Sequence, residues 1–284
     1  MEQNVKLIHS LLFLIRENRL TDDLKLASDC LKSLEGSTYK TAVVFNQGIF
    51  SGEKLKEYLG QFALEFHVIG EGVNVGTAAG RQRCFEYVWE NFPDCNYISE
   101  LHLDMAFSGR WEDALVDYLD THDEPMVSCG IIDKQGNMPF LNKTATLPQD
   151  MEGYGDFLQG LREDIILHGF TNPCIHASEI LKEAGGYNPL FLKGGQCFED
   201  DSMLLSYYYY YGAKRNWYPK INFNSVVYHA VAGQRLNMGG NVMVNFNGLV
   251  NQYGLMGLKR LSTLHKSAWH RSFFAEQYDK LLPR

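Results

Sequence analysis

The sequence lacks three features that would each define a class of protein. Its six cysteines are scattered and form no C-x-x-C pair, which argues against a zinc ribbon or a thioredoxin-like redox site. Lys and Arg total 26 against 34 Asp and Glu, so the net charge of -8 gives no overall basic surface for a nucleic-acid backbone. The longest apolar run near the start, residues 11–15, is far shorter than the roughly 20 residues that cross a bilayer. We therefore expect no nucleic-acid partner and no membrane span.

The rest of the composition is ordinary for a globular protein, with 45% hydrophobic and 21% charged residues. A chain of 284 residues is long enough for one large domain that folds without disulfides or metal. No basic segment followed by a small-residue cleavage site frames residues 11–15, so we expect a cytoplasmic protein with reduced thiols.

Both ends of the chain have helical patterns. The first apolar residues recur at helical spacing, at Ile8, Leu11, Leu12 and Ile15. A second helix is predicted from Thr21, which is a suitable N-cap, to about Leu34. We expect residues 1–38 to form a helical hairpin that packs on the main domain or on another subunit, which allows a homo-oligomer. We expect residues 237–284 to form a helical C-terminal extension.

Between these ends, short apolar runs alternate with helical segments. The predicted strands cover residues 41–45, 66–69, 97–103 and 125–131, and the predicted helices cover residues 53–62, 76–89 and 111–119. This alternation is typical of βαβ units, so residues 39–236 are predicted to form an α/β domain with a mostly parallel sheet. Ligands bind such sheets at the carboxyl ends of the strands.

Two features near predicted strand ends favour a nucleotide site. The turn from Gly70 to Gly76 is not a dinucleotide fingerprint, because Gly76 comes one position late, but it opens a helix whose amides suit a phosphate or ribose. Arg81 lies one turn into that helix and suits a diphosphate, although a solvent-facing arginine is the simpler alternative. Asp104 closes the third strand, where it suits a divalent cation or a helix cap.

The second half of the chain contains candidate acids and a candidate metal ligand. Glu199, Asp200 and Asp201 precede a helical run, where acids are also stabilised by the helix dipole. Because adjacent carboxylates repel one another, one of them is expected to have the raised pKa of a general base. His229 follows a short strand and is either a structural histidine or a metal ligand opposite Asp104.

Taken in order, these segments resemble the GT-A glycosyltransferases, most closely those of family 2. The matching segments are Asn74-Val75-Gly76, Gly80-Arg81-Gln82, Leu103-Asp104-Met105-Ala106, Gly185-Gly186-Tyr187-Asn188, Glu199-Asp200 and His229. They span residues 41–235 in the order of the family pattern. The resemblance implies a Rossmann-like GT-A domain that transfers a hexose from a nucleotide sugar to an acceptor hydroxyl, and the donor that it implies is UDP-linked.

The same resemblance assigns roles to individual residues. Asp200 is the implied general base, and Glu199 orients the acceptor or the base, so that in-line attack inverts the anomeric configuration. The implied metal ligands are Asp104 and His229, which hold Mn²⁺ or Mg²⁺. The implied donor-binding residues are Phe45, Asn46, Gln47, Glu71, Asn74, Arg81 and Asp104.

One departure from the family pattern leaves a second hypothesis open. Ala106 occupies the position of the second aspartate of the family's D-x-D motif, so one metal ligand is missing. The alternative is therefore a non-catalytic protein that binds a nucleotide sugar or acts as a scaffold. A nucleotidyltransferase is a weaker third hypothesis, because residues 46–52 contain no basic side chain for a triphosphate.

Overall fold

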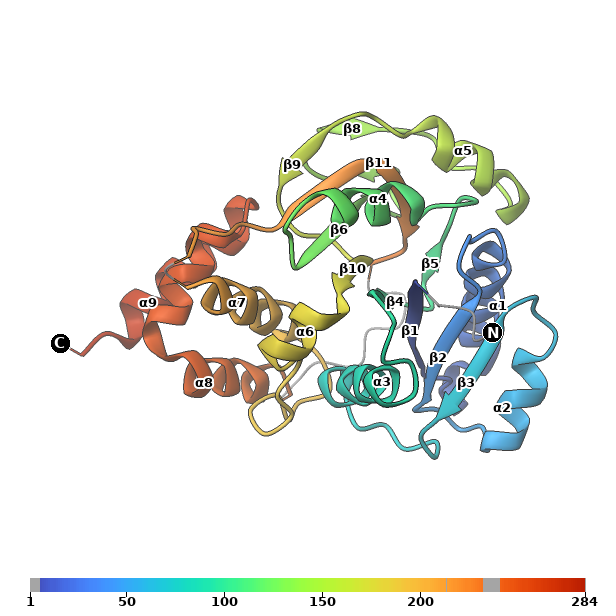
Figure 1. Ribbon diagram of the computed structural model, residues 1–284, viewed down its shortest axis with the longest axis horizontal. Helices are drawn as coiled ribbons and strands as arrows, with labels where there is room; N and C mark the ends of the chain where they lie inside the picture. The colour runs from blue at the N-terminus through green and yellow to red at the C-terminus, as the bar shows by residue number, and fades with distance from the viewer. Residues whose placement is uncertain (1–5, 213, 232–240, 284) are drawn as a thin grey trace.

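A computed structural model describes residues 6–212, 214–231 and 241–283 (Figure 1). The strands are β1 (Leu7–Phe13), β2 (Thr41–Asn46), β3 (Glu65–Ile69), β4 (Tyr97–Leu101), β5 (Met105–Ala106), β6 (Met126–Ile132), β7 (Asn137–Met138), β8 (Lys143–Thr144), β9 (Ile166–His168), β10 (Cys174–Ala177) and β11 (Lys220–His229). The helices are α1 (Leu20–Leu34), α2 (Gly52–Leu59), α3 (Thr77–Asn91), α4 (Asp113–Thr121), α5 (Tyr154–Gly160), α6 (Ser178–Ala184), α7 (Glu199–Tyr211), α8 (Asn241–Leu264) and α9 (Ala268–Leu281).

The main sheet has nine strands in the order β3-β2-β1-β4-β10-β6-β11-β5, with β9 paired to β11. Strands β3, β2, β1, β4, β6 and β11 run in one direction, whereas β10, β5 and β9 run against their neighbours. The α/β prediction is confirmed, and the sheet is mixed. The six strands of common direction end at one edge, so their carboxyl ends point toward the same region.

The predicted helical hairpin at the N-terminus is wrong in its first half. Residues 7–13 form β1, which pairs in parallel with β2 and β4 near the middle of the sheet. Leu7, Leu11 and Phe13 face one apolar cluster, whereas Ile8 faces the other. A strand buried on both faces is apolar at nearly every position, and such a run also satisfies helical spacing. Since β1 belongs to the main sheet, residues 1–38 are not a separate unit.

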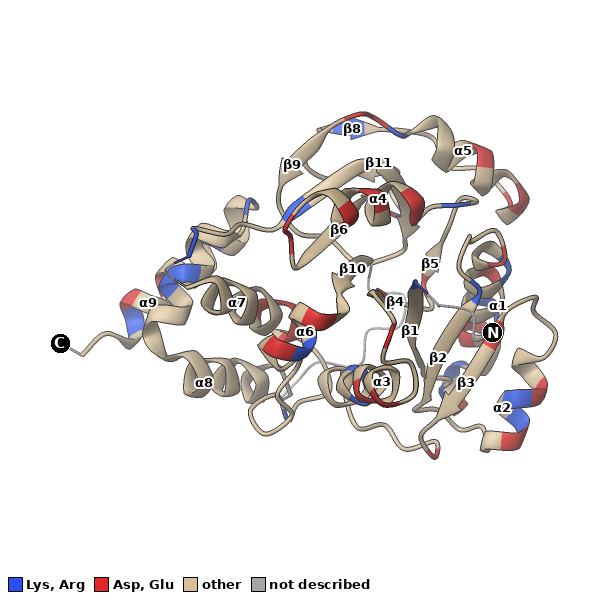
Figure 2. Cartoon of the chain, viewed as in Figure 1, with Lys and Arg blue, Asp and Glu red and all other residues tan. Residues whose placement is uncertain are grey.

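Helices cover both faces of the sheet. The cluster on one face takes its apolar side chains from α1, α2 and α4. The cluster on the other face takes them from α3, α6, α7, α8 and α9. Figure 2 shows acidic and basic segments interspersed on the outer helices, whereas β1 and β2 contain no charged residue. Buried apolar surface therefore holds the layers together, and most charged residues lie at the periphery, with Arg81 and Glu100 among the buried exceptions.

The predicted C-terminal helices are present as α8 and α9, which pack on each other and, through α8, on α7 (Figure 1). Helix α8 is kinked at Gly254, whose φ of 67° lies in the region that favours glycine. The predicted boundary at residues 236 and 237 lies outside the described residues. Within the described part of the chain, no helix is long and apolar enough to cross a membrane.

Candidate active site

A cavity of about 990 Å³ opens beside the carboxyl ends of β1, β4 and β11. Its lining includes six of the residues predicted from the sequence, namely Gln47, Arg81, Asp104, Glu199, Asp200 and His229. Segments from both halves of the sheet and from the C-terminal helices therefore meet at one place. Such a crevice outside the strand ends is the usual ligand site of an open α/β sheet.

Asp104 and His229 lie together, as the sequence predicts, and His102 joins them. Nε2 of His229 is 3.4 Å from Oδ1 of Asp104. The rings of His102 and His229 meet edge to face with centroids 5.3 Å apart. One potential ligand atom from each residue lies within 4.8 Å of the others. The main chain fixes this arrangement, because the amide of Ala230 donates to the carbonyl of Asp104 at 2.9 Å.

The ring nitrogens of His102 and His229, with the Asp104 carboxylate, are suited to binding a cation. Nδ1 of His229 is 3.1 Å from the carbonyl oxygen of Asn172, which only accepts, so Nδ1 carries a proton and Nε2 is the nitrogen left to bind a cation. Nε2 faces the Asp104 carboxylate. Burial, with the nearby positive charge of Arg81, lowers the pKa of His102 to about 3, so the His102 ring is neutral. Two imidazoles and a carboxylate suit Mn²⁺ better than Mg²⁺, which prefers oxygen ligands.

Ala106, which replaces the second aspartate of the D-x-D pattern, lies in β5 and is buried in an apolar cluster with Ile132 and Val226. It therefore offers nothing to the cavity. The sequence lacks that ligand, but His102 stands two residues before Asp104 and provides a different one. The sequence reasoning missed His102, although the H-x-D spacing beside a strand end was a usable signal.

Glu199 and Asp200 begin α7 and line the same cavity. Burial raises the pKa of Asp200 to about 7, and the charges of Glu100 and Asp201 contribute to this rise. Burial and the charge of Asp200 raise the pKa of Glu199 to about 8. Nδ2 of Asn172 donates to Oδ2 of Asp200 at 3.1 Å. A carboxyl with a pKa near 7 is suited to general base catalysis at neutral pH.

The turn before this acid pair has an unfavourable backbone conformation. Cys197 and Phe198 have φ values of 82° and 65°, which non-glycine residues rarely adopt. Such conformations persist where surrounding contacts hold them, and they are frequent at functional sites. Asp201, the third acid, does not share the role of the other two, because Nε2 of His265 lies 2.7 Å from its Oδ1.

Arg81 lines the cavity, yet its side chain is only 1% exposed and its guanidinium is bound by the protein. Nη1 donates to the carbonyl of Ser10 at 2.6 Å, Nη2 donates to the carbonyl of Leu101, and Nε lies 3.3 Å from Oε2 of Glu100. These contacts tie the ends of β1 and β4 together. The guanidinium is thus occupied by the main chain and Glu100, which gives Arg81 a structural role, and its contact with a diphosphate stays a prediction.

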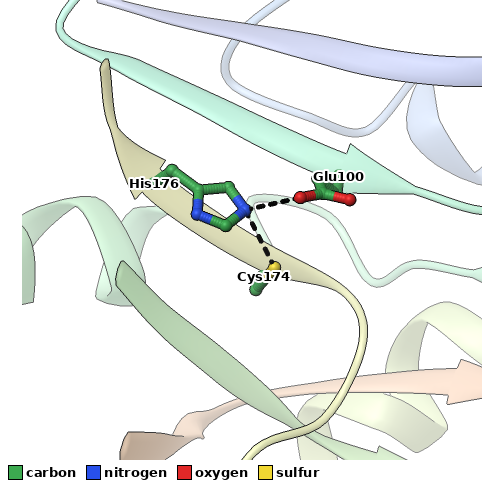
Figure 3. A group of neighbouring side chains, drawn as sticks. All are labelled: Glu100, Cys174 and His176. Atoms are coloured by element: carbon green, nitrogen blue, oxygen red, sulfur yellow. Dashed lines mark hydrogen bonds and ion pairs between the residues drawn. The ribbon is translucent and has the colours of Figure 1, made fainter. Parts of the chain in front are cut away.

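Behind Arg81 lies a fully buried group of Glu100, Cys174 and His176 (Figure 3). Nε2 of His176 is 2.8 Å from Oε1 of Glu100 and 3.2 Å from Sγ of Cys174. Nδ1 of His176 contacts the Tyr207 hydroxyl at 2.7 Å, and the Tyr187 hydroxyl donates to Glu100 at 2.9 Å. Although burial raises the pKa of Glu100, His176 and Arg81 lower it below its usual value. Protein donors therefore satisfy this carboxylate.

The other predicted donor residues build the turns around the cavity. Asn46 is buried, with Nδ2 donating to the Phe50 carbonyl at 2.7 Å, and Phe45 is buried in the core. Oε1 of Gln47 accepts from the Val75 amide at 3.1 Å. Glu71 and Asn74 are exposed on the turn before α3. Of these five, Gln47 alone is in the described cavity lining, so the other four have structural or peripheral positions.

Three further contributors were not predicted. Asn172 precedes β10 and contacts both Asp200 and His229. His265 holds Asp201, and Trp269 of α9 lines the cavity. No local pattern marks these residues, because tertiary packing alone brings the loop before β10 and the C-terminal helices to the strand ends.

Comparison of the sequence with models of protein families and with curated proteins finds no match. The fold does match solved structures. A structure of S. aureus TarS, residues 1–349, superposes with a TM-score of 0.55 at 13% identity and covers 96% of this chain and 70% of that chain. A TarS complex with UDP-GlcNAc gives 0.55 at 11% identity, covering 96% and 71%.

A second kind of structure is also similar. GalNAc-T7 with UDP, GalNAc and Mn²⁺ superposes with a TM-score of 0.59 at 14% identity, and the match covers 96% of this chain and 55% of that chain. TarS and GalNAc-T7 are GT-A glycosyltransferases. The chain described here therefore has the GT-A fold, as the sequence resemblance implies. Assignment to family 2 stays a prediction.

Proposed function

We propose that this protein is a glycosyltransferase that moves a hexose from a UDP-linked donor to an acceptor hydroxyl. The observation that carries the proposal is the convergence of two groups on one cavity: His102, Asp104 and His229 on one side, and Glu199 and Asp200 on the other. A cation site beside an acid pair is suited to transfer from a sugar diphosphate. UDP in the TarS and GalNAc-T7 structures, and Mn²⁺ in the latter, support this choice of donor and metal.

His102, Asp104 and His229 would hold a divalent cation, with Mn²⁺ favoured by the two imidazoles. When bound, the cation neutralises charge that develops on the departing diphosphate. Asp200 accepts the proton of the acceptor hydroxyl through its carboxylate, and Asn172 holds that carboxylate in place. The hydroxyl oxygen bonds to the anomeric carbon as the bond to the diphosphate oxygen breaks on the opposite face, which inverts the configuration. Glu199 orients the acceptor or the base.

Calorimetric titration with UDP, with and without Mn²⁺, tests the donor half of the proposal. Wild-type protein is expected to bind UDP more tightly with Mn²⁺, and both Asp104→Ala and His102→Ala are expected to lose that difference. Glu90→Ala, at an exposed glutamate of α3 outside the cavity lining, is the control and should bind as wild type. Unchanged Mn²⁺ dependence in Asp104→Ala contradicts the metal site.

The scaffold alternative makes a different prediction. A non-catalytic protein binds UDP but never hydrolyses or transfers the sugar of a UDP-sugar with any metal. For an enzyme, Asp200→Asn keeps UDP affinity within about threefold, because the substitution leaves the donor contacts, but loses at least about a hundredfold of the transfer rate. Full transfer by Asp200→Asn contradicts the assignment of the base.

A further inference from the structure

Helix α9 places an exposed tryptophan beside the candidate catalytic acids. Trp269 is 67% exposed, yet it belongs to the cavity lining together with Asp200. Large aromatic side chains are usually covered in a folded protein. An exposed tryptophan on the wall of a ligand cavity therefore points to something that covers it when the site is filled.

The position of Trp269 is fixed by a stack of rings that leads back to the acid pair. Its ring lies 5.6 Å from that of Phe273 at an interplanar angle of 11°. Phe273 in turn stacks on Phe198 at 6.1 Å and 22°, and Phe198 directly precedes Glu199. The edge of His270 meets Trp269 at 4.8 Å. The indole is therefore held rigidly, which lowers the entropy lost when a ligand stacks on it.

The same part of the cavity contains polar atoms without partners. Within the described residues, Nδ1 of His270 and Oε2 of Glu199 are buried and make no hydrogen bond. Buried polar atoms in native proteins nearly always have a partner, so each of these two atoms in the cavity lining is open to a ligand that supplies one. A pyranose combines an apolar C–H face, which lies flat on an aromatic ring, with hydroxyls at its rim that donate and accept.

We infer that Trp269 and Phe273, with His270, form an acceptor subsite for a pyranose ring, so that the acceptor is itself a saccharide. This inference rests on the proposed function, since Asp200 is the base that the subsite serves. The Phe198–Phe273–Trp269 stack sets the acceptor ring on the α9 side of the acid pair. The group of His102, Asp104 and His229 lines the same cavity at the strand ends, where the proposed function places the donor diphosphate.

Saturation-transfer difference NMR tests the inference with cellobiose, chitobiose, lactose and maltose, each in the presence and absence of UDP and Mn²⁺. We expect at least one disaccharide to bind, with its ring C–H protons receiving the transferred signal. Trp269→Ala is expected to weaken that binding at least about tenfold, as loss of an aromatic anchor does, whereas Trp269→Phe stays within about threefold. Met256→Ala, which removes another exposed apolar side chain from α8, is the control.

The outcomes separate this inference from the proposed function. If UDP binds with Mn²⁺ but no disaccharide binds, or if Trp269→Ala binds as wild type, the saccharide subsite is overturned and the donor site stands. If a disaccharide binds in a manner that depends on Trp269 but UDP does not bind, the subsite stands and the proposed transfer from UDP-sugar fails. UDP affinity measured in Trp269→Ala shows that the variant is folded.

Discussion

Replacing Glu199 by glutamine is expected to stabilise the protein at high pH while impairing its activity. Burial and the charge of Asp200 give Glu199 a pKa of about 8, against an ordinary value of 4.5. A carboxyl whose pKa is raised by folding costs no stability while it is protonated. As the pH rises from its pKa in the unfolded chain toward its pKa in the folded chain, it progressively lowers the free energy of unfolding. At pH 8 this cost is on the order of 4 kcal/mol, since each pKa unit corresponds to about 1.4 kcal/mol.

Urea unfolding at pH 4.5 and pH 8 measures the effect directly. Glu199→Gln is expected to raise the free energy of unfolding by about 2 to 4 kcal/mol at pH 8 and by less than about 0.5 kcal/mol at pH 4.5. Glu90→Gln, at an exposed glutamate of α3, serves as the control and should change neither value appreciably. Equal effects of Glu199→Gln at the two pH values would refute the reasoning, because a pH-independent gain cannot come from a titrating carboxyl.

Three further predictions concern the pH dependence of transfer, the Asn172 amide and the Arg81 guanidinium. Because Asp200 acts as a base only when deprotonated and its pKa is about 7, the transfer rate should rise with pH through a midpoint near 7. The hydrogen bond from Asn172 lowers that pKa, so Asn172→Ala should move the midpoint upward, and an unmoved midpoint would contradict the role of this amide. Arg81→Met should leave Glu100 buried without its cation and cost about 3 to 5 kcal/mol of unfolding free energy. If Arg81 instead bound the donor diphosphate, UDP affinity would fall and stability would hold, with exposed Arg83→Met as the control for both measurements.

The sequence predicts the centre of this fold well because each parallel strand is a short apolar run between helices. β2, β3, β4 and β6 all form within a residue or two of their predicted positions. β1 fails for a physical reason: both of its faces are buried, so its apolar residues carry no strand-like alternation. β10 is too short, at four residues, to leave a pattern.

The residues of the candidate site also fall into those that the sequence predicts and those that it does not. Asp104, Glu199, Asp200 and His229 stand at element ends, where a linear pattern locates them. The burial of Arg81 and its three protein partners could not be predicted, because they are properties of the packed sheet. Trp269 belongs to a helix whose place against the cavity depends on contacts with α8 and with Phe198, which no short stretch of sequence encodes.

The reversed direction of β10 changes which part of the chain reaches the cavity. Its neighbours β4 and β6 deliver their following loops to that edge, but β10 delivers the residue that comes before it. Asn172 therefore spans the two halves of the chemistry, with its side-chain amide on Asp200 and its carbonyl on His229. An isotope label on this one residue would report proton transfer through the amide resonance and cation occupancy through the carbonyl resonance, so the two events could be timed against each other in a single sample.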